Sequence, residues 1–337
     1  SLFHTPTKIA RIRSKYYYQY PQLFQDEHIP IDVCISPEKL VTEHLENLIH
    51  YPGTSLVLEF AEGRALLIMI EPIKQNVMIG QTIAQIHQHL YGIDAQIIAI
   101  FRQHQMIEVT KTMIIEPEDQ VLFVTSSEAI QQLLIILGHY AHPNRRIIIA
   151  GGGHIGNELA QTLEENYRLK IIEKDEKRAH ELSSQLHKTT VLQGDVADRE
   201  LLINENIEFT DVFCAVTNDD EANIMSCLQA KRLGAKHVMA LINRNAYVDL
   251  IEESAIDQAI SPQLITIGSI LTKLRRGNMV RVHRFQHSEA EAIELITHGD
   301  EHTSKVVGRT IDQLNLPPGC TVAAVVRHHE VLLSSPH

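Results

Sequence analysis

The sequence of 337 residues contains no tryptophan, and aromatic residues make up only 5% of it. Basic residues are also in the minority, with 30 lysines and arginines against 42 aspartates and glutamates, for a formal net charge of −12. Proteins that bind DNA or RNA do so mainly through clustered lysine and arginine side chains, often with aromatic residues between them. The composition therefore argues against a nucleic-acid partner.

Cysteine is scarce, and Cys34, Cys214, Cys227 and Cys320 are scattered without a Cys-x-x-Cys pair. This pattern is typical of reduced cytosolic thiols and does not predict a zinc site. Long apolar runs are missing too, since none approaches the roughly 20 residues of a membrane-spanning helix. We therefore expect any membrane association to be peripheral and to depend on a partner.

The start of the chain, Ser1 to His4, has neither an initiator methionine nor a basic region followed by an apolar core. We interpret it as neither a signal peptide nor a natural beginning. At this length, with 44% hydrophobic and 21% charged residues, the chain can form two or more domains with cores of their own. A soluble multi-domain protein is therefore expected.

The most informative motif is a Gly-x-Gly-x-x-Gly turn between an apolar run, Ile147 to Ala150, and a helical pattern. It consists of Gly151, Gly152, Gly153, His154, Ile155 and Gly156. In dinucleotide-binding proteins the first glycine permits a tight turn, the second lets the backbone approach a pyrophosphate, and the third lets the helix pack on the strand. Unpaired N-H groups of the first helical turn then face the phosphates. The alternative is a glycine-rich turn that merely joins a strand to a helix.

An acidic residue follows at the spacing that such a site needs. The next apolar run, Leu169 to Ile172, ends at Glu173, which lies 22 residues after Gly151. An acid about 20 residues after the first glycine accepts hydrogen bonds from the adenosine ribose. Because its carboxylate would repel the 2′-phosphate of NADP, the sequence favours NAD or NADH.

Two later strand patterns also end in polar residues, one at Asp195 and the other at Thr217 and Asn218. Ligands of parallel α/β sheets bind at the carboxyl ends of the strands, so these three residues are candidates for contact with adenine, ribose or the ligand backbone. The alternative interpretation is structural. Asp195 would then only turn the chain, and the acidic run after Asn218 would only cap a helix that begins near Ala222.

The chain also contains an internal repeat. Three pairs of segments match in the same order at displacements of 225 to 228 residues, which indicates descent from two similar halves. The pairs are Ile31–Pro37 with Ile256–Pro262, Ile79–Ile83 with Val307–Ile311, and Ala99–Arg102 with Ala324–Arg327. If the glycine turn is projected back by the same distance, its counterpart in the first half falls before Ser1. In the same way, the second half ends before the position that corresponds to the end of the first half. We therefore expect that the start of the first half and the extreme C-terminus are missing.

Four segments follow from these landmarks. We predict a remnant of a first nucleotide-binding domain with a connecting helix at 1–53, and a small α+β domain at 54–143. A complete nucleotide-binding domain is expected at 144–277, after a hinge at His142-Pro143-Asn144, and a shortened second α+β domain at 278–337. Strands that alternate with helices between 146 and 242 predict a mostly parallel, doubly wound α/β sheet.

The local patterns give individual elements. Apolar residues recur at helical spacing from Leu40 to Leu48, so a helix is expected after Ser36-Pro37 and, by the repeat, after Ser261-Pro262, and these two helices are candidates for the connections between lobes. The strand patterns are Ile9–Ile12, Val33–Ile35, Leu56–Leu58, Ala65–Ile70, Ile97–Phe101 and Val121–Val124. A helical stretch carries Tyr16, Tyr17, Tyr18 and Tyr20. These tyrosines favour core or oligomer packing, with a partner surface as the alternative.

Together these features resemble the RCK (KTN) domains that regulate potassium transport. The resemblance rests on the glycine turn, Glu173, the Gly194-Asp195 pair, the segment from Ala215 to Ile224 and the duplicated Ile-Asp-x-x-Ile-Ser-Pro string. A tandem pair of nucleotide-binding and small domains is similar to the regulatory subunits of Trk-type bacterial potassium uptake. The resemblance implies a Rossmann-like lobe followed by a small α+β lobe, each present twice.

The resemblance also implies a function. It implies a cytosolic, non-enzymatic homo-oligomer, a tetramer or ring, that binds NAD or NADH and in some members ATP or ADP. Such a protein is peripheral on the cytosolic face of the inner membrane, where it docks on a membrane-embedded potassium channel subunit and changes its gating. The nucleotide contacts that the resemblance implies fall on Gly151, Gly152, Gly153, His154, Ile155, Glu173, Thr217 and Asn218, and in the first half on Arg11. The counterpart of Arg11 is about Leu241, so the two halves need not bind the same ligand.

Two other functions fit the nucleotide-binding motif. An NAD-dependent dehydrogenase would use the same turn, but it also needs an acid or base beside the nicotinamide and a substrate-binding domain. The 20 histidines supply candidate bases, yet no His-Glu-x-x-His or comparable constellation singles one out. The third class is a regulator of a potassium efflux or antiport system, which the duplication disfavours.

Overall fold

The computed structural model describes residues 8–12, 17, 20–24, 29–72, 77–103, 105–107, 109–138, 145–251, 254–274, 279–285, 290–300, 302–328 and 330–334. The chain forms two compact units, Ser1–His50 with Pro143–Ile270, and Tyr51–His142 with Leu271–His337. The predicted hinge at 142–144 and the predicted boundary at 277 lie outside the described residues. Within the described ranges, no helix combines the length and the apolar character of a membrane span.

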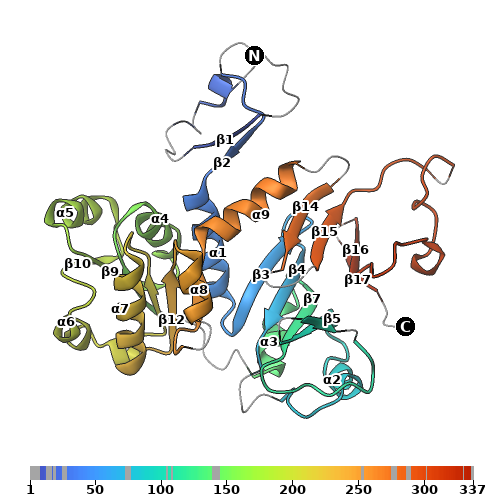
Figure 1. Cartoon of the computed structure of the whole chain (residues 1–337), viewed down its shortest axis with the longest axis horizontal. Coiled ribbons are helices and arrows are strands. Elements are labelled where there is room, and N and C mark those ends of the chain that lie inside the picture. The colour runs from blue at the N-terminus through green and yellow to red at the C-terminus, as the bar shows by residue number, and fades with distance from the viewer. Residues whose placement is uncertain are drawn as a thin grey trace. The chain divides into compact units, whose positions relative to one another are not determined.

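The first unit contains a six-stranded parallel sheet with helices on both faces (Figure 1). Its strands are β8 (Arg146–Ala150), β9 (Arg168–Glu173), β10 (Thr190–Gln193), β11 (Val212–Ala215), β12 (His237–Leu241) and β13 (Gln258–Ile260). The helices are α4 (His154–Leu163), α5 (Glu176–Gln185), α6 (Arg199–Asn204), the short η3 (Ile207–Phe209), α7 (Asp220–Arg232), α8 (Asn245–Ile251) and α9 (Pro262–Leu274). The strand order β10-β9-β8-β11-β12-β13 reverses between β8 and β11, which confirms the predicted doubly wound Rossmann-like fold.

Side chains of the central strand alternate between the two faces of this sheet. Ile147 and Ile149 of β8 belong to one apolar core, and Ile148 and Ala150 belong to the other. A strand buried on both faces must be apolar throughout, which explains the continuous run that precedes the glycine turn. The first core includes α4 and α5, and the second includes α6, α7 and α8.

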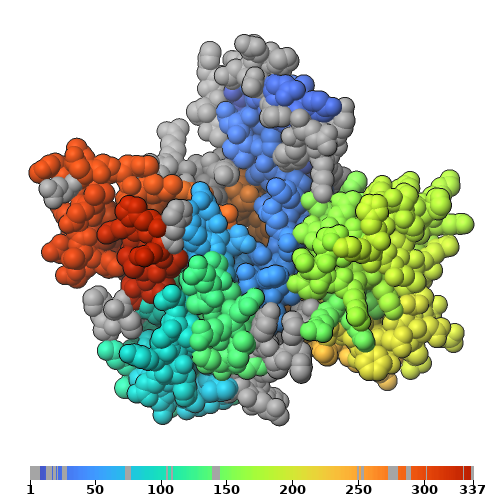
Figure 2. All heavy atoms as spheres, turned by 180° about the vertical axis from the view of Figure 1, so that it is seen from behind, coloured from blue at the N-terminus to red at the C-terminus, as the bar shows by residue number. Residues whose placement is uncertain are grey.

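A helix from the first half of the chain completes one of these cores. α1 (Pro37–His50) contacts α4, and Figure 2 shows its blue atoms against the green segment that contains α4. Its apolar face, Val41, Leu45, Leu48 and Ile49, is at most 2% exposed. The predicted helix is confirmed, and it ends at His50, where the first unit gives way to the second.

The remaining strands of the first unit pair separately. β1 (Ile9–Arg11) and β2 (Val33–Ile35) form a two-stranded parallel sheet, and the short η2 (Pro21–Phe24) lies between them in the sequence. Of the predicted helical tyrosine stretch, Tyr16 and Tyr18 lie outside the described residues, whereas Tyr17 and Tyr20 are 49% and 36% exposed. Nothing described therefore tests the helix predicted for them.

The second unit contains the small α+β lobes. β3 (Thr54–Phe60), β4 (Ala65–Ile70), β5 (Ala95–Arg102), β6 (Gln105–Ile107) and β7 (Gln120–Ser126) form an antiparallel sheet in the order β3-β4-β7-β5-β6. α2 (Ile83–His89) and α3 (Ile130–Ile136) share one core with this sheet. A separate apolar cluster joins the sheet to the later lobe, which consists of β14 (Met279–Arg284), β15 (Glu291–Leu295), η4 (Ile311–Gln313), β16 (Ala324–Arg327) and β17 (Glu330–Leu333).

The repeat is visible as duplicated hydrogen bonds. Asp32 accepts a bond from the N-H of Lys8 at 2.6 Å, and its counterpart Asp257 accepts one from the N-H of Val238 at 2.7 Å. The serines of the repeated string each accept a bond from the N-H three residues later, at 3.3 Å for Ser36 and 3.4 Å for Ser261. Each serine therefore caps a helix that begins at the following proline, as expected for these positions.

The β1–β2 register also gives the counterpart of Arg11. Arg11 pairs with Ile35 in the first half, and Leu241 pairs with Ile260 in the second. The next backbone N-H then bonds to the same isoleucine carbonyl in both halves, Ile12 at 2.8 Å and Ile242 at 2.9 Å. The expected correspondence of Arg11 with Leu241 is therefore a structural one.

A buried acid, Asp211, organises the amino-terminal edge of the parallel sheet. Asp211 accepts bonds from the N-H groups of Arg145 and Arg146 and from Lys236 Nζ, at 2.7 to 2.9 Å. Burial alone would raise the pKa of Asp211, but these hydrogen bonds outweigh it and hold the pKa below its ordinary value. The charged form of Asp211 therefore stabilises the fold.

Replacing Leu45 tests the packing of α1. Leu45→Ala should lower the free energy of unfolding by about 2–5 kcal/mol, because a fully buried leucine leaves a cavity when truncated. Glu43→Ala on the exposed face of the same helix should change it by less than about 0.5 kcal/mol. Urea unfolding followed by circular dichroism measures both, and equal effects of the two variants would contradict the assignment of α1 to this core.

The role of Asp211 predicts a pH dependence. A depressed folded-state pKa stabilises the protein above the ordinary value of 3.8, and this contribution is lost as the pH falls through the folded-state pKa. Asp211→Asn should therefore be less stable than the wild type at pH 7, and the difference should shrink toward pH 3. Urea midpoints measured across this range test it, and a difference that stays constant would rule it out.

Candidate functional site

The glycine turn lies between β8 and α4, as its sequence context predicts. Gly151 has φ +110°, and a Cβ there would lie 2.9 Å from the Thr217 methyl group. A Cβ on Gly156 would lie 1.9 Å from the carbonyl oxygen of Gly151, so only glycine lets α4 approach the strand this closely. Gly153 differs, because a Cβ there would meet nothing within 4 Å. The backbone at Gly153, with His154 and Ile155 opening α4, is thus accessible to a ligand.

Glu173 lies at the end of β9 and reaches the turn. Its carboxylate accepts a bond from the N-H of Gly152 and another from the N-H of Asp175, both at 2.8 Å. The structure therefore brings the predicted ribose acid to the predicted phosphate turn. Whether Glu173 and the glycine turn bind a nucleotide stays a prediction.

Asp195 follows β10 on the same edge of the sheet. It accepts bonds from Lys174 Nζ at 2.8 Å and from the N-H of Ala197 at 2.9 Å. The hydrogen bond from Lys174 lowers the pKa of Asp195 and raises that of Lys174. Asp195 therefore makes bonds that turn the chain, and Lys174, its ion-pair partner, directly follows Glu173 in the sequence. Its contact with a nucleotide stays a prediction.

Thr217 and Asn218 follow β11, beside the glycine turn. Thr217 Oγ1 and N-H both donate to Asn223 Oδ1, at 2.6 and 3.0 Å, so a buried asparagine of α7 holds this loop. Asn223 Nδ2 in turn donates to the carbonyls of Thr217 and Leu241, which ties the end of β11 to the end of β12. α7 begins two residues before the position expected from the sequence, because Asp219 accepts a bond from the N-H of Ala222 and caps the helix there.

Arg11 is the one predicted contact that lies apart from these residues. It belongs to β1, where its guanidinium is 3.4 Å from Glu38 Oε1 and its side chain is 55% exposed. Among the described contacts, none joins Arg11 to the glycine turn.

Four residues that shape the site were not among the predicted contacts, although two of them lie in the segment from Ala215 to Ile224 that carries the resemblance. They are Lys174, Arg178, Asp220 and Asn223. Arg178 Nε donates to the carbonyl oxygen of Gly152 at 2.8 Å, and the buried Asp220 accepts bonds from the N-H groups of Asn243 and Arg244. Asparagine and aspartate are seldom buried, yet Asn223 and Asp220 of α7 are. Polar residues at these helix positions were the signal that could have pointed to the two residues.

The two glycines of the turn provide a matched test. Gly156→Ala should lower the melting temperature, with a cost of about 1–3 kcal/mol, because its methyl group collides with the Gly151 carbonyl. Gly153→Ala should cost less than about 1 kcal/mol, since the space around it is open and its φ of −63° suits alanine. Calorimetry compares the two, and a larger loss for Gly153→Ala would contradict the geometry.

Comparisons with known proteins now give the family. Residues 147–262 match the TrkA-N domain, and residues 68–138 match the TrkA-C domain. The Trk system potassium uptake protein TrkA of Vibrio alginolyticus is 48% identical over 335 residues, which cover 99% of this chain and 73% of that protein. The TrkA of Halomonas elongata is 46% identical over 334 residues, with the same coverage of 99% and 73%.

Solved structures agree on the fold. The GsuK RCK domain superposes with a TM-score of 0.59 at 18% identity, and the match covers 98% of this chain and 69% of that one. A GsuK channel bound to NAD superposes with a TM-score of 0.55 at 18% identity, covering 98% and 57%. At this identity the likeness shows a shared RCK fold and nothing further. The identity to the curated relatives over nearly the whole chain shows the family: the chain belongs to the TrkA family of Trk system potassium uptake proteins.

Proposed function

We propose that the chain is a non-enzymatic regulatory subunit that binds NAD or NADH and thereby changes the gating of a membrane-embedded Trk potassium channel subunit. The observation that carries the proposal is the contact between the glycine turn and Glu173, at 2.8 Å from Gly152. It brings a carboxylate suited to a ribose to the turn that precedes α4, whose first-turn N-H groups suit a pyrophosphate. Membership of the TrkA family supports potassium uptake as the process that the ligand controls.

The residues present fit such a nucleotide. The open space at Gly153 would admit the pyrophosphate against the first turn of α4, where the helix dipole favours negative charge. Glu173 would accept bonds from the adenosine ribose hydroxyls, and Asp195, with Thr217 and Asn218, would line the same edge. NAD, NADH, ADP and ATP share the adenosine diphosphate part that these groups recognise.

The ligand would act as a signal by changing how the parts of the protein are arranged. We propose a first nucleotide-binding remnant at 1–53, small lobes at 54–143 and 278–337, and a complete nucleotide-binding domain at 144–277, in a subunit that assembles as a homotetramer on the cytosolic face of the membrane. α1 ends at His50, where the first segment of the first unit ends. α9 contains Ile270, the last residue of the first unit, and Leu271, which begins the second segment of the second unit. A nucleotide shifts this arrangement only if it binds one conformation more tightly than another.

Calorimetric titration of NADH, NAD, ADP and ATP tests the binding part of the proposal. Glu173→Ala should weaken NADH binding by about tenfold, the equivalent of one or two lost hydrogen bonds. Glu176→Ala, which removes a neighbouring exposed carboxylate at the start of α5, is the matched control and should leave affinity within about twofold. Melting temperatures of both variants separate lost contacts from lost folding.

Two outcomes would contradict the proposal. Hydride transfer between NADH and a small substrate would make the protein a dehydrogenase, so turnover is followed at 340 nm in the same samples. Absence of nucleotide binding by the folded wild type would remove the ligand from the mechanism. Potassium flux through the reconstituted channel subunit, measured with and without NADH, then tests gating.

A further inference from the structure

Arg178 reaches the glycine turn from the first turn of α5. Its Nε donates to the carbonyl oxygen of Gly152 at 2.8 Å, and the Nη1 atom of the same guanidinium donates to Glu181 at 2.8 Å. The side chain is 28% exposed. Arg178 therefore holds a main-chain group of the turn, while its charge is shared with an acid on its own helix.

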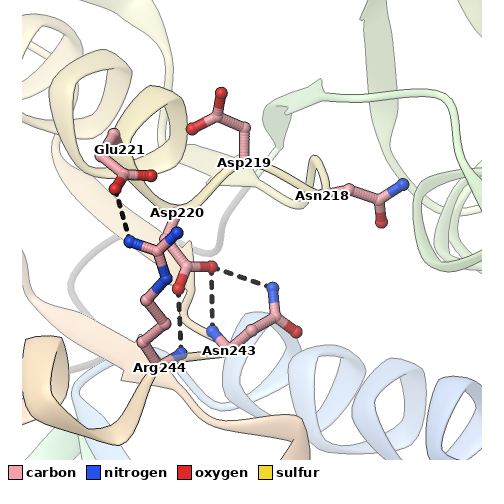
Figure 3. Close-up of a pocket in the computed structure, with 6 residues that line it drawn as sticks. All are labelled: Asn218, Asp219, Asp220, Glu221, Asn243 and Arg244. Atoms are coloured by element: carbon pink, nitrogen blue, oxygen red, sulfur yellow. Dashed lines mark hydrogen bonds and ion pairs between the residues drawn. The ribbon is translucent and has the colours of Figure 1, made fainter.

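Arg244, on the same edge of the sheet, makes a different kind of contact. It lies beside a pocket, where its Nη1 donates to Glu221 at 2.7 Å (Figure 3). The same atom donates to the Tyr247 hydroxyl at 2.9 Å. Both partners are side chains, whereas Arg178 bonds to a backbone carbonyl. The contact of Arg178 is thus the kind that sets the orientation of a peptide group.

Arg178 also belongs to a closed ring of four hydrogen bonds. The N-H groups of Gly152 and Asp175 donate to the two carboxylate oxygens of Glu173. The N-H of Arg178 donates to Asp175 Oδ1, and Arg178 Nε completes the ring at Gly152. All four distances are 2.8 Å. The ring joins the end of β9 and the start of α5 to the second glycine of the turn, so each bond restrains the others.

Packing fixes the position of Gly152 within this ring. A Cβ on Gly152 would lie 2.3 Å from Leu182 Cδ1 and 2.9 Å from Glu173 Oε2. Leu182 belongs to α5 and is fully buried, so it has little room to give way. Gly152 therefore lies directly against α5 and the end of β9, and the ring then decides which way its peptide groups point.

The orientation of the Gly152 carbonyl determines that of the next N-H. The peptide bond between Gly152 and Gly153 is trans, so the carbonyl and the N-H of Gly153 point in opposite directions. Arg178 holds the carbonyl toward α5, which directs the N-H of Gly153 away from that helix. Among the described contacts this N-H has no acceptor, and a Cβ on Gly153 would meet nothing within 4 Å. It is a donor facing open space directly before α4, where an anion is favoured.

We propose that Arg178 is a positioning residue for the pyrophosphate of the ligand. By holding the Gly152 carbonyl it presents the Gly153 N-H to a phosphate oxygen, and this role depends on its hydrogen bond and not on its charge. The inference rests on the proposed function, since it requires a nucleotide at the glycine turn. Adenosine has the ribose but no phosphate, so it reports the Glu173 contact alone, whereas ADP and NADH report the phosphate contact as well.

Two substitutions of Arg178 separate the hydrogen bond from the charge. Glutamine places its Nε2 at the same point along the side chain as arginine Nε, so Arg178→Gln removes the charge and keeps a donor for Gly152. Arg178→Met has a similar length and removes both. Arg178→Met should weaken ADP and NADH about fivefold and leave adenosine within about twofold, while Arg178→Gln should keep all three within about twofold. Calorimetry measures ADP and NADH, and ligand-observed NMR measures adenosine.

Lys177→Met, which removes an exposed cation from the neighbouring position of α5, is the matched control and should change none of the three affinities. Equal weakening of ADP by Arg178→Gln and Arg178→Met would overturn the proposal, because the charge would then act on the phosphate directly. Equal weakening of adenosine and ADP by Arg178→Met would also overturn it, since that is the result of a merely structural role. Failure of the proposed function looks different, because the folded wild type would then bind neither ADP nor NADH.

Discussion

The close packing of α4 on the end of β8 is the contact on which the nucleotide-binding unit depends. It brings Gly156 so near the Gly151 carbonyl that a single methyl group would fill the remaining space. α4 begins at His154, four residues after β8 ends, and the N-H of Gly152 in the turn between them donates to Glu173. Thr217 packs on Gly151 from β11, and Glu173 reaches Gly152 from β9. Three neighbouring strand ends thus meet at one turn.

Polar side chains then hold both edges of the sheet, and of these Asp211, Asp220 and Asn223 are buried. Asp211 and Asp257 bind main-chain N-H groups at the amino edge, and Asp220 and Asn223 bind main-chain groups at the carboxyl edge. A buried carboxylate or amide is costly unless its hydrogen bonds are satisfied, and here backbone groups at strand ends satisfy them. This arrangement leaves the exposed polar groups at the carboxyl edge available for a ligand. These bonds hold together the strand ends that carry the proposed site.

The two halves of the chain share several backbone junctions. Thr82 and Thr310 both form capping boxes, with Gln85 and Gln313 respectively, and these glutamines stand at equivalent positions of the repeat. Asp32 and Asp257, like Ser36 and Ser261, make the same bonds at the same places, as shown above. Arg11 and Leu241 occupy one strand position with different side chains. The two halves therefore share these backbone contacts, whereas an exposed arginine in the first half corresponds to a buried leucine in the second.

The sequence by itself determined the elements of this protein and much of the candidate site. Period-two and helical patterns, the glycine turn and the capped Ser-Pro helix start are local signals, so α1, β8 and the position of Glu173 followed from them. The tertiary structure decided which distant groups meet. No local pattern shows that α1 of the first half packs on α4 of the second, or that Asn223 ties β11 to β12. Such contacts depend on the order of strands in the sheet, because hydrogen bonding across strand ends joins residues that the sequence separates.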